Sequence, residues 1–432
     1  MSTLKPKGST AVNIAVSIEG LIRNGDWPPV HKLPTVRALS DELGVNPNTV
    51  SAAYKQLRDA GVIETDGRRG SFVPEKAAIV HGEMAVPHGL VDLASGNVDI
   101  RLLPELRPEW LADYHLGANI GNYGDHPSLL SLLNRWLPEN CGIHAEPVLF
   151  SGSLDIMERA LAQRCLPGAK VLVEDPCWQP LLPMLAALRL EAVPIHMDAE
   201  GAVLPSENIL NQAAAVILTP RAHSPTGISY GTARWRQWQQ ALSGRNALLL
   251  IDDHWGPLSR QAFPGLAGFD NEWIYSTSTS KFLGTDFRLA VAAGNGTVIA
   301  AMKKRYALGP RWMSNLLQHL TASVWQSLLP DGLARINASY NQRRRHFISC
   351  LHSHGIELPD GVGLHVWLPV HNELFTVQAL AARGWAVQAG TSLSLSKQAA
   401  VRITLSNLNW DDCHTLAQDI ADILNSRTHA LY

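Results

Sequence analysis

The chain has 432 residues, which is too long for one small domain and suits two or three. Apolar residues make up 46% and charged residues 17%, so a large core is available and extensive disorder is not expected. The net charge of −2 gives no overall attraction to nucleic acid. The five cysteines lie far apart without metal-ligand spacing, and neither a signal peptide nor an apolar membrane span is present. We therefore expect a reducing, cytoplasmic location and no metal.

The first 76 residues show three stretches with helical spacing of apolar side chains. Residues 9–25 carry the first stripe, formed by Val12, Ile14, Ile18, Leu21 and Ile22. Residues 33–44 carry the second, formed by Val36, Leu39 and Leu43. The third stretch, VNPNTVSAAYKQLRDAG, begins with Asn46 as a suitable N-cap and Pro47 as a suitable first helical residue. Its buried stripe is formed by Val50, Ala53, Tyr54 and Leu57.

The other face of the third helix is polar near its start, which suits a helix that enters the major groove of DNA. This face presents short donors and acceptors plus one cation, namely Asn48, Thr49, Ser51 and Lys55. Residues 61–73 then read as a two-stranded hairpin with Arg68 and Arg69 at its tip, a flexible basic loop for phosphate or minor-groove contact. A small solvated helical cap is the alternative interpretation.

Residues 24–73 resemble a GntR-type winged helix-turn-helix over nearly the whole domain. The resemblance implies a double-stranded DNA operator as partner. It implies contacts from Arg37, Asn46, Asn48, Thr49 and Ser51, and from the wing around Arg68 and Arg69. Pro47 stands where other members carry a base-reading side chain, a departure that fits a different operator sequence.

A linker at residues 77–92 separates this domain from a larger one at residues 93–432. In the larger domain, continuous apolar runs alternate with helix-like stretches, which predicts a mostly parallel sheet covered by helices at about residues 93–300. The expected strands are residues 169–175, 191–197, 214–220, 247–253, 272–278 and 288–294. Long helices and two strand-like runs, 364–370 and 401–406, predict a smaller α+β lobe at about residues 301–432.

Polar residues gather just after these strands, where open α/β sheets bind ligands. The turn at Gly152 and Ser153 opens a helix and offers free amides to a phosphate, although a plain N-cap would look the same. Trp178 follows another strand and is either a core residue or a face for a planar ring. Asp252 and Asp253 end a buried strand, and Lys281 follows the next one.

One ligand would use all of these groups, a phosphorylated pyridine that carries an aldehyde. Lys281 would form an imine with the aldehyde, and one carboxylate would hold the ring nitrogen protonated. The Gly-Ser turn and Arg288 would hold the phosphate. A plain surface lysine beside an N-cap and a solvated acid is the alternative.

Residues 92–425 resemble fold-type I aminotransferases, with motifs in the family's order from DLASGN through SGSLDIM, IDDHW and STSKF to VRITLSN. By this resemblance pyridoxal 5'-phosphate is the cofactor, Lys281 is the Schiff-base lysine, Asp252 partners the pyridine nitrogen and Trp178 stacks on the ring. The phosphate ligands are Ser153 with the adjacent Leu154, Ser278, Arg288 and, from the partner subunit, the residue equivalent to Tyr123. Arg402 corresponds to the arginine that binds a substrate carboxylate.

Two departures from that family stand beside the cofactor's ring oxygen. Ser224 replaces the usual Asn in HSPTG, and His254-Trp255 replaces the usual Tyr after the strand-end Asp. A serine is shorter and a histidine donates or accepts according to its tautomer, so cofactor binding survives these changes more easily than efficient catalysis. A packed strand-end histidine is the alternative for His254.

A GntR reader joined to an aminotransferase-like domain is the layout of the MocR regulators, which this chain resembles. The resemblance implies a transcriptional regulator that senses pyridoxal 5'-phosphate and controls vitamin B6 genes, with at most weak transaminase activity. It also implies a homodimer with a head-to-tail, domain-swapped arrangement, and RNA polymerase is a further candidate partner. The alternatives are a working aminotransferase that carries a DNA-binding domain, and a regulator whose large domain serves only for dimerisation.

Overall fold

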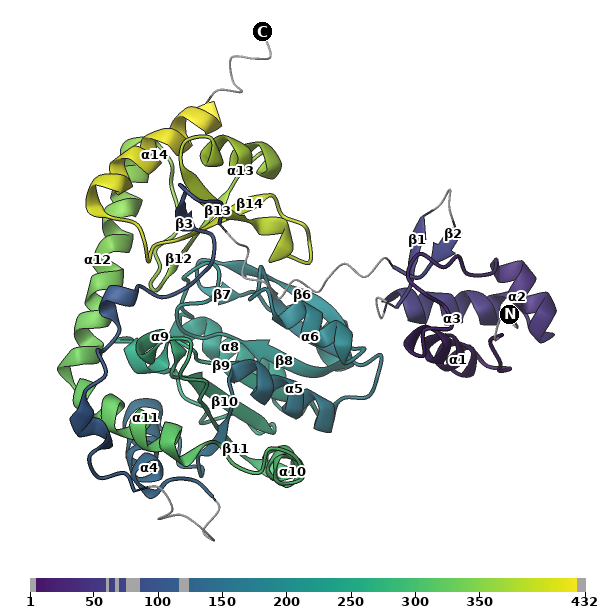
Figure 1. The fold of residues 1–432 in the computed structure, drawn as a ribbon, viewed down its shortest axis with the longest axis horizontal. Coiled ribbons are helices and arrows are strands. Elements are labelled where there is room, and N and C mark those ends of the chain that lie inside the picture. The colour runs from purple at the N-terminus through teal and green to yellow at the C-terminus, as the bar shows by residue number, and fades with distance from the viewer. Residues whose placement is uncertain (1–4, 60–61, 67–69, 75–85, 116–123, 426–432) are drawn as a thin grey trace. The chain divides into compact units, whose positions relative to one another are not determined.

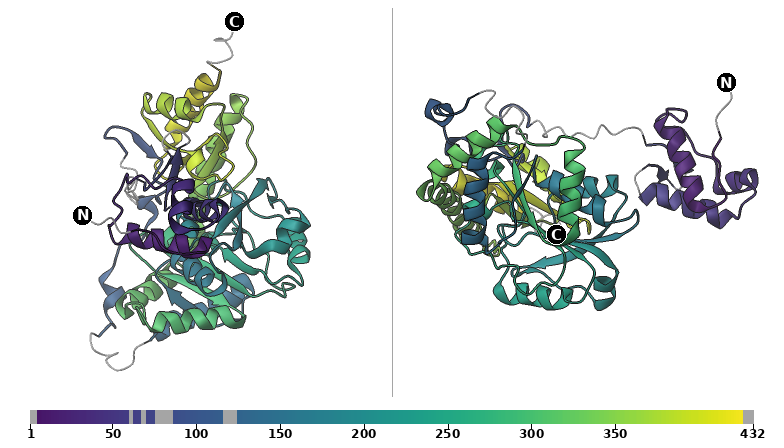
Figure 2. Two further views of the ribbon diagram at one scale, coloured as in Figure 1. Left: turned by 90° about the vertical axis from the view of Figure 1, so that its right-hand side faces the viewer. Right: turned by 90° about the horizontal axis from the view of Figure 1, so that it is seen from below.

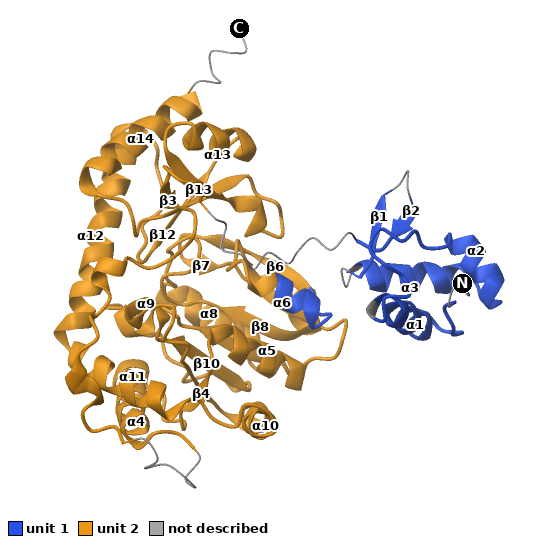
Figure 3. Ribbon diagram, viewed as in Figure 1, with its two compact units in different colours: residues 1–85, 183–191 blue, residues 86–182, 192–432 orange. Residues whose placement is uncertain are grey.

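The structure is a computed structural model that describes residues 5–59, 62–66, 70–74, 86–115 and 124–425. The chain separates into two compact units, shown in Figure 3: residues 1–85 with 183–191, and residues 86–182 with 192–432. Most of helix α6 (Leu181–Ala187) falls in the first unit. Among the described residues no helix is long and apolar enough to cross a membrane.

Three helices and an antiparallel hairpin make up the N-terminal part of the first unit (Figure 1). They are α1 Ala11–Arg23, α2 Val36–Leu43, α3 Pro47–Asp59, β1 Glu64–Asp66 and β2 Gly70–Phe72. Thr10 and Thr35 cap α1 and α2, because each hydroxyl accepts a hydrogen bond from a backbone N–H in the first turn. Asn46 likewise accepts from the Asn48 N–H at 2.8 Å, at the start of α3. The order of elements is that of a winged helix-turn-helix, as predicted.

The core of this domain follows the predicted stripes with one exception. Val50, Ala53, Tyr54 and Leu57 of α3 are all buried. The prediction was wrong for Val12, which is 58% exposed. Val12 precedes Ile14 by two residues, which places the two side chains about 200° apart around a helix with 3.6 residues per turn. Because Ile14 faces the core, Val12 faces away from it.

The second unit is built on an eight-stranded sheet in the order β4-β11-β10-β9-β8-β5-β6-β7. Its strands are β4 Val148–Phe150, β5 Lys170–Asp175, β6 Glu191–Asp198, β7 Gly201–Ala202, β8 Ala213–Leu218, β9 Leu248–Asp252, β10 Trp273–Ser278 and β11 Ala290–Gly294. The neighbours β5, β8, β9 and β10 run parallel, which confirms the mostly parallel sheet. Strand β11 runs antiparallel to both β10 and β4.

Helices lie on both faces of this sheet (Figure 2), so β9 is buried along its whole length. The helices are α4 Pro127–Cys141, α5 Ser153–Arg164, α7 Glu207–Gln212, α8 Thr232–Leu242, α9 Ser280–Leu283, α10 Gly296–Ala307 and α11 Asn315–Leu328. Short 3₁₀ turns occur at η1 Ile100–Leu102, η2 Pro108–Leu111, η3 Gly256–Leu258 and η4 Gly390–Ser392.

A smaller lobe has a four-stranded sheet in the order β12-β14-β13-β3 and its own apolar core. Its elements are β3 Val91–Leu93, α12 Asp331–Ser353, β12 His365–Pro369, α13 Glu373–Ala381, β13 Trp385–Ala389, β14 Ala400–Thr404 and α14 Trp410–Asn425. Strand β3 pairs in parallel with β13. The small lobe therefore takes a strand from before the large sheet, although the sequence assigned Val91 and Asp92 to the linker and the whole lobe to residues after 300.

Candidate functional site

The candidate site lies at the carboxyl ends of β9 and β10, which are parallel neighbours with Ser276 paired to Asp252. Strand β9 ends at Asp252, and β10 ends three residues before Lys281. Parallel strands end at the same edge of a sheet. The two charges influence each other, since Asp252 raises the pKa of Lys281 and Lys281 lowers the pKa of Asp252. The structure therefore brings the predicted lysine and carboxylate together.

Asp252 is a buried carboxylate with an unused oxygen. Its Oδ1 makes no hydrogen bond within the described protein, and the residue is 6% exposed. Burial first, and then the neighbouring carboxylates of Asp253 and Glu174, raise its pKa to about 7. A buried polar atom without a partner is costly. Asp252 is therefore suited to a ligand that brings a positively charged donor.

The adjacent Asp253 has a different role, because its partners are all protein groups. Arg221 contacts both of its carboxylate oxygens through Nε and Nη2, and the Tyr275 hydroxyl donates to Oδ2 at 2.7 Å. Asp253 and Arg221 are both buried. Of the two acids at the end of β9, Asp253 is paired with protein side chains, whereas Asp252 keeps an oxygen that a ligand could use.

Lys281 has a depressed pKa. Its surroundings lower the pKa to about 8, first through burial and then through the positive charge of Arg402, while Asp252 opposes the shift. The side chain still keeps partial access to solvent. A reachable amine with this pKa holds a sizeable neutral fraction near neutral pH, which is the form that attacks carbonyl groups.

The His254 side chain lies near Asp252 and Lys281, whereas the Trp255 side chain packs into the protein core. His254 lies with Nδ1 3.8 Å from Asp252 Oδ2, too far for a hydrogen bond. Burial, with Lys281 and His223, lowers its pKa to about 3, so the imidazole stays neutral and forms no ion pair. Trp255 is 1% exposed, packs edge-on against Tyr340 and donates to Asn337. Of the two residues that replace the usual Tyr, only His254 lies in the site.

Gly152, Ser153 and Arg288 form a cradle at the start of α5. Gly152 has φ 141°, and a Cβ built on it would lie 2.8 Å from Arg288 Nη2. The Ser153 hydroxyl is buried and has no hydrogen-bond partner among the described residues. The first turn of α5 also offers free backbone N–H groups and the positive end of the helix dipole, so an anion bound there would find donors in these amides and in the Ser153 hydroxyl. Leu154 is the second residue of α5 and contributes to that turn.

For the other residues predicted to bind a cofactor, the structure gives burial and local hydrogen bonds but, among the residues it describes, no contact that defines a role. Trp178 and Ser224 are half-buried. Ser278 ends β10 and shares a hydrogen bond with Ser280 at 3.0 Å. These facts leave the stacking role of Trp178 and the ring-oxygen role of Ser224 as predictions.

Arg402 on β14 faces the site from the small lobe. It is 6% exposed, its Nη2 donates to the Ala94 carbonyl, and its Nε has no partner among the described residues. Burial lowers its pKa to about 10. A Cβ on Gly96 would lie 3.3 Å from its guanidinium nitrogens, so the glycine leaves room for the arginine.

The sequence missed three buried groups that surround this site. Glu174 at the end of β5 accepts from the Tyr230 hydroxyl at 2.6 Å and lies 3.3 Å from His223. His365 on β12 is also buried, and burial with the charge of Arg402 holds its pKa well below the usual value. The signal for Glu174 was present as another acid at a strand end. The signal for His223 is its place in HSPTG, directly before Ser224.

The described residues predicted to contact DNA lie on α2, on α3 and just before α3, at the surface of their own domain. Arg37, Asn46, Asn48, Ser51 and Lys55 are exposed and Thr49 is half-buried. The Asn46 side chain already serves as the helix cap, so it has one oxygen fewer for DNA. Arg68, Arg69 and Tyr123 lie outside the described residues.

Two family models match the chain, and together they cover most of it. The model described as bacterial regulatory proteins, gntR family, matches residues 10–73, and the model described as aminotransferase class I and II matches residues 88–420. The chain therefore belongs to the MocR-type transcription regulators, in which a GntR winged helix-turn-helix that binds DNA precedes a class I and II aminotransferase domain.

One relative aligns along nearly the full length. The vitamin B6 salvage pathway transcriptional repressor PtsJ of Salmonella typhimurium is 37% identical over 433 residues, covering 97% of this chain and 99% of PtsJ. The HTH-type transcriptional repressor YtrA of Bacillus subtilis is 34% identical over 122 residues, covering 26% of this chain and 94% of YtrA.

Solved structures share the fold of the larger domain. A multiple substrate aminotransferase from Thermococcus profundus has a TM-score of 0.70 at 18% identity, covering 80% of this chain and 93% of that chain. The kynurenine aminotransferase of Pyrococcus horikoshii has a TM-score of 0.68 at 20% identity, covering 79% and 92%. At this identity the likeness concerns the fold.

Proposed function

We propose that this regulator responds to pyridoxal 5'-phosphate held at Lys281, and that it controls genes of vitamin B6 salvage. The observation that carries the proposal is the set of unsatisfied groups at one edge of the sheet. Asp252 Oδ1 and the Ser153 hydroxyl lack partners within the described protein, and Gly152 leaves a space beside Arg288. The name of the relative PtsJ supports the B6 part of the proposal.

The residues at this edge fit the cofactor group by group. Pyridoxal phosphate supplies an aldehyde that condenses with a primary amine, a basic pyridine nitrogen and a dianionic phosphate. Lys281 offers a partly neutral amine near pH 8. Asp252 would accept a hydrogen bond from a protonated ring nitrogen, and a positive charge beside its buried carboxylate would favour ionisation of that carboxylate.

The cradle of Gly152, Ser153 and Arg288, together with the dipole of α5, would hold the phosphate of the cofactor. Arg288 contributes a full positive charge, and Ser153 and Ser278 contribute hydroxyl donors. The first turn of α5, which includes Leu154, contributes backbone N–H groups and the positive end of the helix dipole. Trp178 is proposed to cover one face of the ring, and Tyr123 of a second copy to reach the phosphate.

A sensing role is favoured over turnover by the groups beside the ring. His254 remains neutral because its pKa is held at about 3, so it supplies a weak hydrogen bond where the family has a phenol. Ser224 is shorter than the amide that the family has there. Both changes weaken the control of proton positions on which rapid catalysis depends, while the lysine, the carboxylate and the phosphate cradle are kept.

Conversion of amino acids is the second candidate function. The observation in its favour is Arg402, a buried guanidinium whose charge acts on Lys281 and whose Nε has no partner within the described part of the chain. A guanidinium in that place binds a carboxylate. The same arginine would serve a regulator that recognises an amino acid as a second effector.

The regulator is proposed to act as a cytoplasmic homodimer, head-to-tail and domain-swapped, that reads paired half-sites with α3. Exposed Asn48, Ser51 and Lys55, with Arg37, Thr49 and the wing residues Arg68 and Arg69, would contact the operator. Cofactor that binds one arrangement of the domains more tightly shifts the population that binds DNA.

Borohydride reduction of the loaded protein, followed by peptide mapping, tests the site. The expected result is one pyridoxyl group on Lys281 and none in a Lys281→Ala variant. Labelling scattered over several surface lysines, with equal uptake by the variant, would overturn the site and favour a domain that serves only for dimerisation. Rapid and complete loss of cofactor absorbance with an amino acid would instead support the enzymatic candidate.

A further inference from the structure

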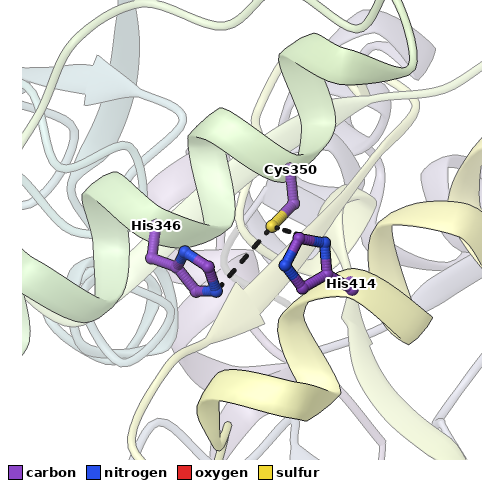
Figure 4. A group of neighbouring side chains, drawn as sticks. All are labelled: His346, Cys350 and His414. Atoms are coloured by element: carbon purple, nitrogen blue, oxygen red, sulfur yellow. Dashed lines mark hydrogen bonds between the residues drawn. The ribbon is translucent and has the colours of Figure 1, made fainter.

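Three side chains of types that can bind metal ions, two histidines and a cysteine, meet on the small lobe. His346 and Cys350 lie one turn apart on α12, and His414 faces them from α14 (Figure 4). Residues four apart on a helix share one face. The packing of α12 against α14 therefore brings together donors that are 64 residues apart in the sequence, counted from Cys350 to His414.

The distances suit a single small cation. Cys350 Sγ lies 3.4 Å from His414 Nδ1 and 4.0 Å from His346 Nε2, and all three ligand atoms lie within 4.8 Å of one another. A tetrahedral zinc ion with bonds of about 2.3 Å to sulfur and about 2.0 Å to nitrogen separates its donors by roughly 3.3–3.6 Å. Small rotations of the two imidazole rings therefore close the site.

A metal ion could reach these side chains from solvent, and the Trp410 ring orients His346. His414 is exposed, His346 is half-buried and Cys350 is buried, so solvent reaches the sulfur from the histidine side. The His346 ring packs on Trp410 with centroids 4.2 Å apart. Its Nε2 also lies 3.3 Å from the Trp410 carbonyl, a long contact that coordination would replace. Among the described residues this is the one such group of three or more histidine, cysteine or acidic side chains.

The donor set selects the kind of metal. One thiolate and two imidazoles are borderline-soft ligands, which favour Zn²⁺ over Mg²⁺ or Ca²⁺. The spacing of the cysteines alone does not predict this site, because two of its three donors are histidines and one of them lies four residues before Cys350.

We propose that His346, Cys350 and His414 bind one Zn²⁺ ion, with water as the fourth ligand. The Cys350 thiol releases its proton to solvent on binding, and the thiolate and both neutral imidazoles donate their electron pairs to the metal. The ion joins α12 to α14 and so stabilises the small lobe. The site is independent of the proposed function at Lys281.

Cobalt titration of the full-length protein, free of any histidine tag and stripped with chelator, tests the site. The expected result is a thiolate-to-cobalt absorption band that saturates at one equivalent and disappears when Zn²⁺ is added. Cys350→Ser should abolish the band, and His414→Asn should weaken Co²⁺ binding by about tenfold or more. His352→Asn on the same helix and Cys165→Ser elsewhere should leave both the band and the affinity unchanged.

Two results would overturn the proposal. One is a wild-type protein without a sulfur-to-cobalt band, and the other is a His414→Asn variant that binds Co²⁺ as tightly as the wild type. Because His414 is exposed, its variant keeps the fold and decides the matter even where Cys350→Ser does not fold. Zn²⁺ should also raise the midpoint of thermal unfolding of the wild type by more than that of His414→Asn.

Discussion

The depressed pKa of Lys281 predicts how fast pyridoxal phosphate binds as the pH changes. A pKa of about 8 leaves about one amine in ten neutral at pH 7, whereas an ordinary lysine at 10.5 leaves about one in three thousand. The neutral amine is the reactive form. The rate should therefore rise with pH and level off above about pH 8.

Substitutions of the two charges beside Lys281 should move this midpoint in opposite directions. Arg402 lowers the pKa of Lys281 and Asp252 raises it. Arg402→Gln should therefore shift the midpoint upwards from about 8, and Asp252→Asn should shift it downwards. Arg343→Gln removes an arginine that pairs with Asp99 and should leave the midpoint in place.

Stopped-flow absorbance of cofactor mixed with cofactor-free protein over a pH series measures these midpoints. Lys281→Ala supplies the background from surface lysines. A wild-type rate that keeps rising tenfold per pH unit well above about pH 8 would refute the depressed pKa. A downward shift in Arg402→Gln would refute the assigned electrostatics.

Three further predictions concern the cradle, the ring and the DNA. Gly152→Ala should weaken binding of pyridoxal phosphate by about tenfold, because its Cβ would lie 2.8 Å from Arg288 Nη2 in a backbone conformation that L side chains rarely adopt. Equilibrium dialysis measures this affinity, and an unchanged affinity would contradict the phosphate cradle. Ser224→Asn combined with His254→Tyr should speed amino-acid-driven loss of cofactor absorbance by about tenfold or more, and no change would show that these residues do not limit turnover. Lys55→Ala should weaken DNA binding and reduce its salt dependence by about one counterion, measured by anisotropy at several salt concentrations; an unchanged salt slope would remove Lys55 from the phosphate contacts.

Local pattern predicted the elements because each signal is contained in a few residues. Continuous apolar runs such as 247–253 identified buried strands, and a parallel sheet places their ends at one edge. That argument was enough to join Asp252 with Lys281. The cap at Asn46 was likewise predictable from the sequence, because an N-cap residue and a proline at the first helical position are neighbours.

Pairings over long sequence distances were not predictable in this way. No local sequence pattern at Val91 or Asp92 predicts that they form a strand beside β13, which lies almost 300 residues later in the chain. The sequence also left open whether His254 or Trp255 faces the ring, because that depends on Tyr340 and Asn337 on α12. The cluster of His346, Cys350 and His414 depends on how α12 packs on α14.

The central claim is that the cofactor site and the DNA-binding face are coupled, and one measurement tests it most directly. Fluorescence anisotropy with the DNA upstream of the protein's own gene gives DNA affinity with and without pyridoxal phosphate, for the wild type and Lys281→Ala. We expect the cofactor to change wild-type affinity by about 5- to 150-fold, and bound DNA to change cofactor affinity by the same factor, because linkage is reciprocal. Lys281→Ala should show neither change. Equal wild-type DNA affinity with and without cofactor would contradict the account.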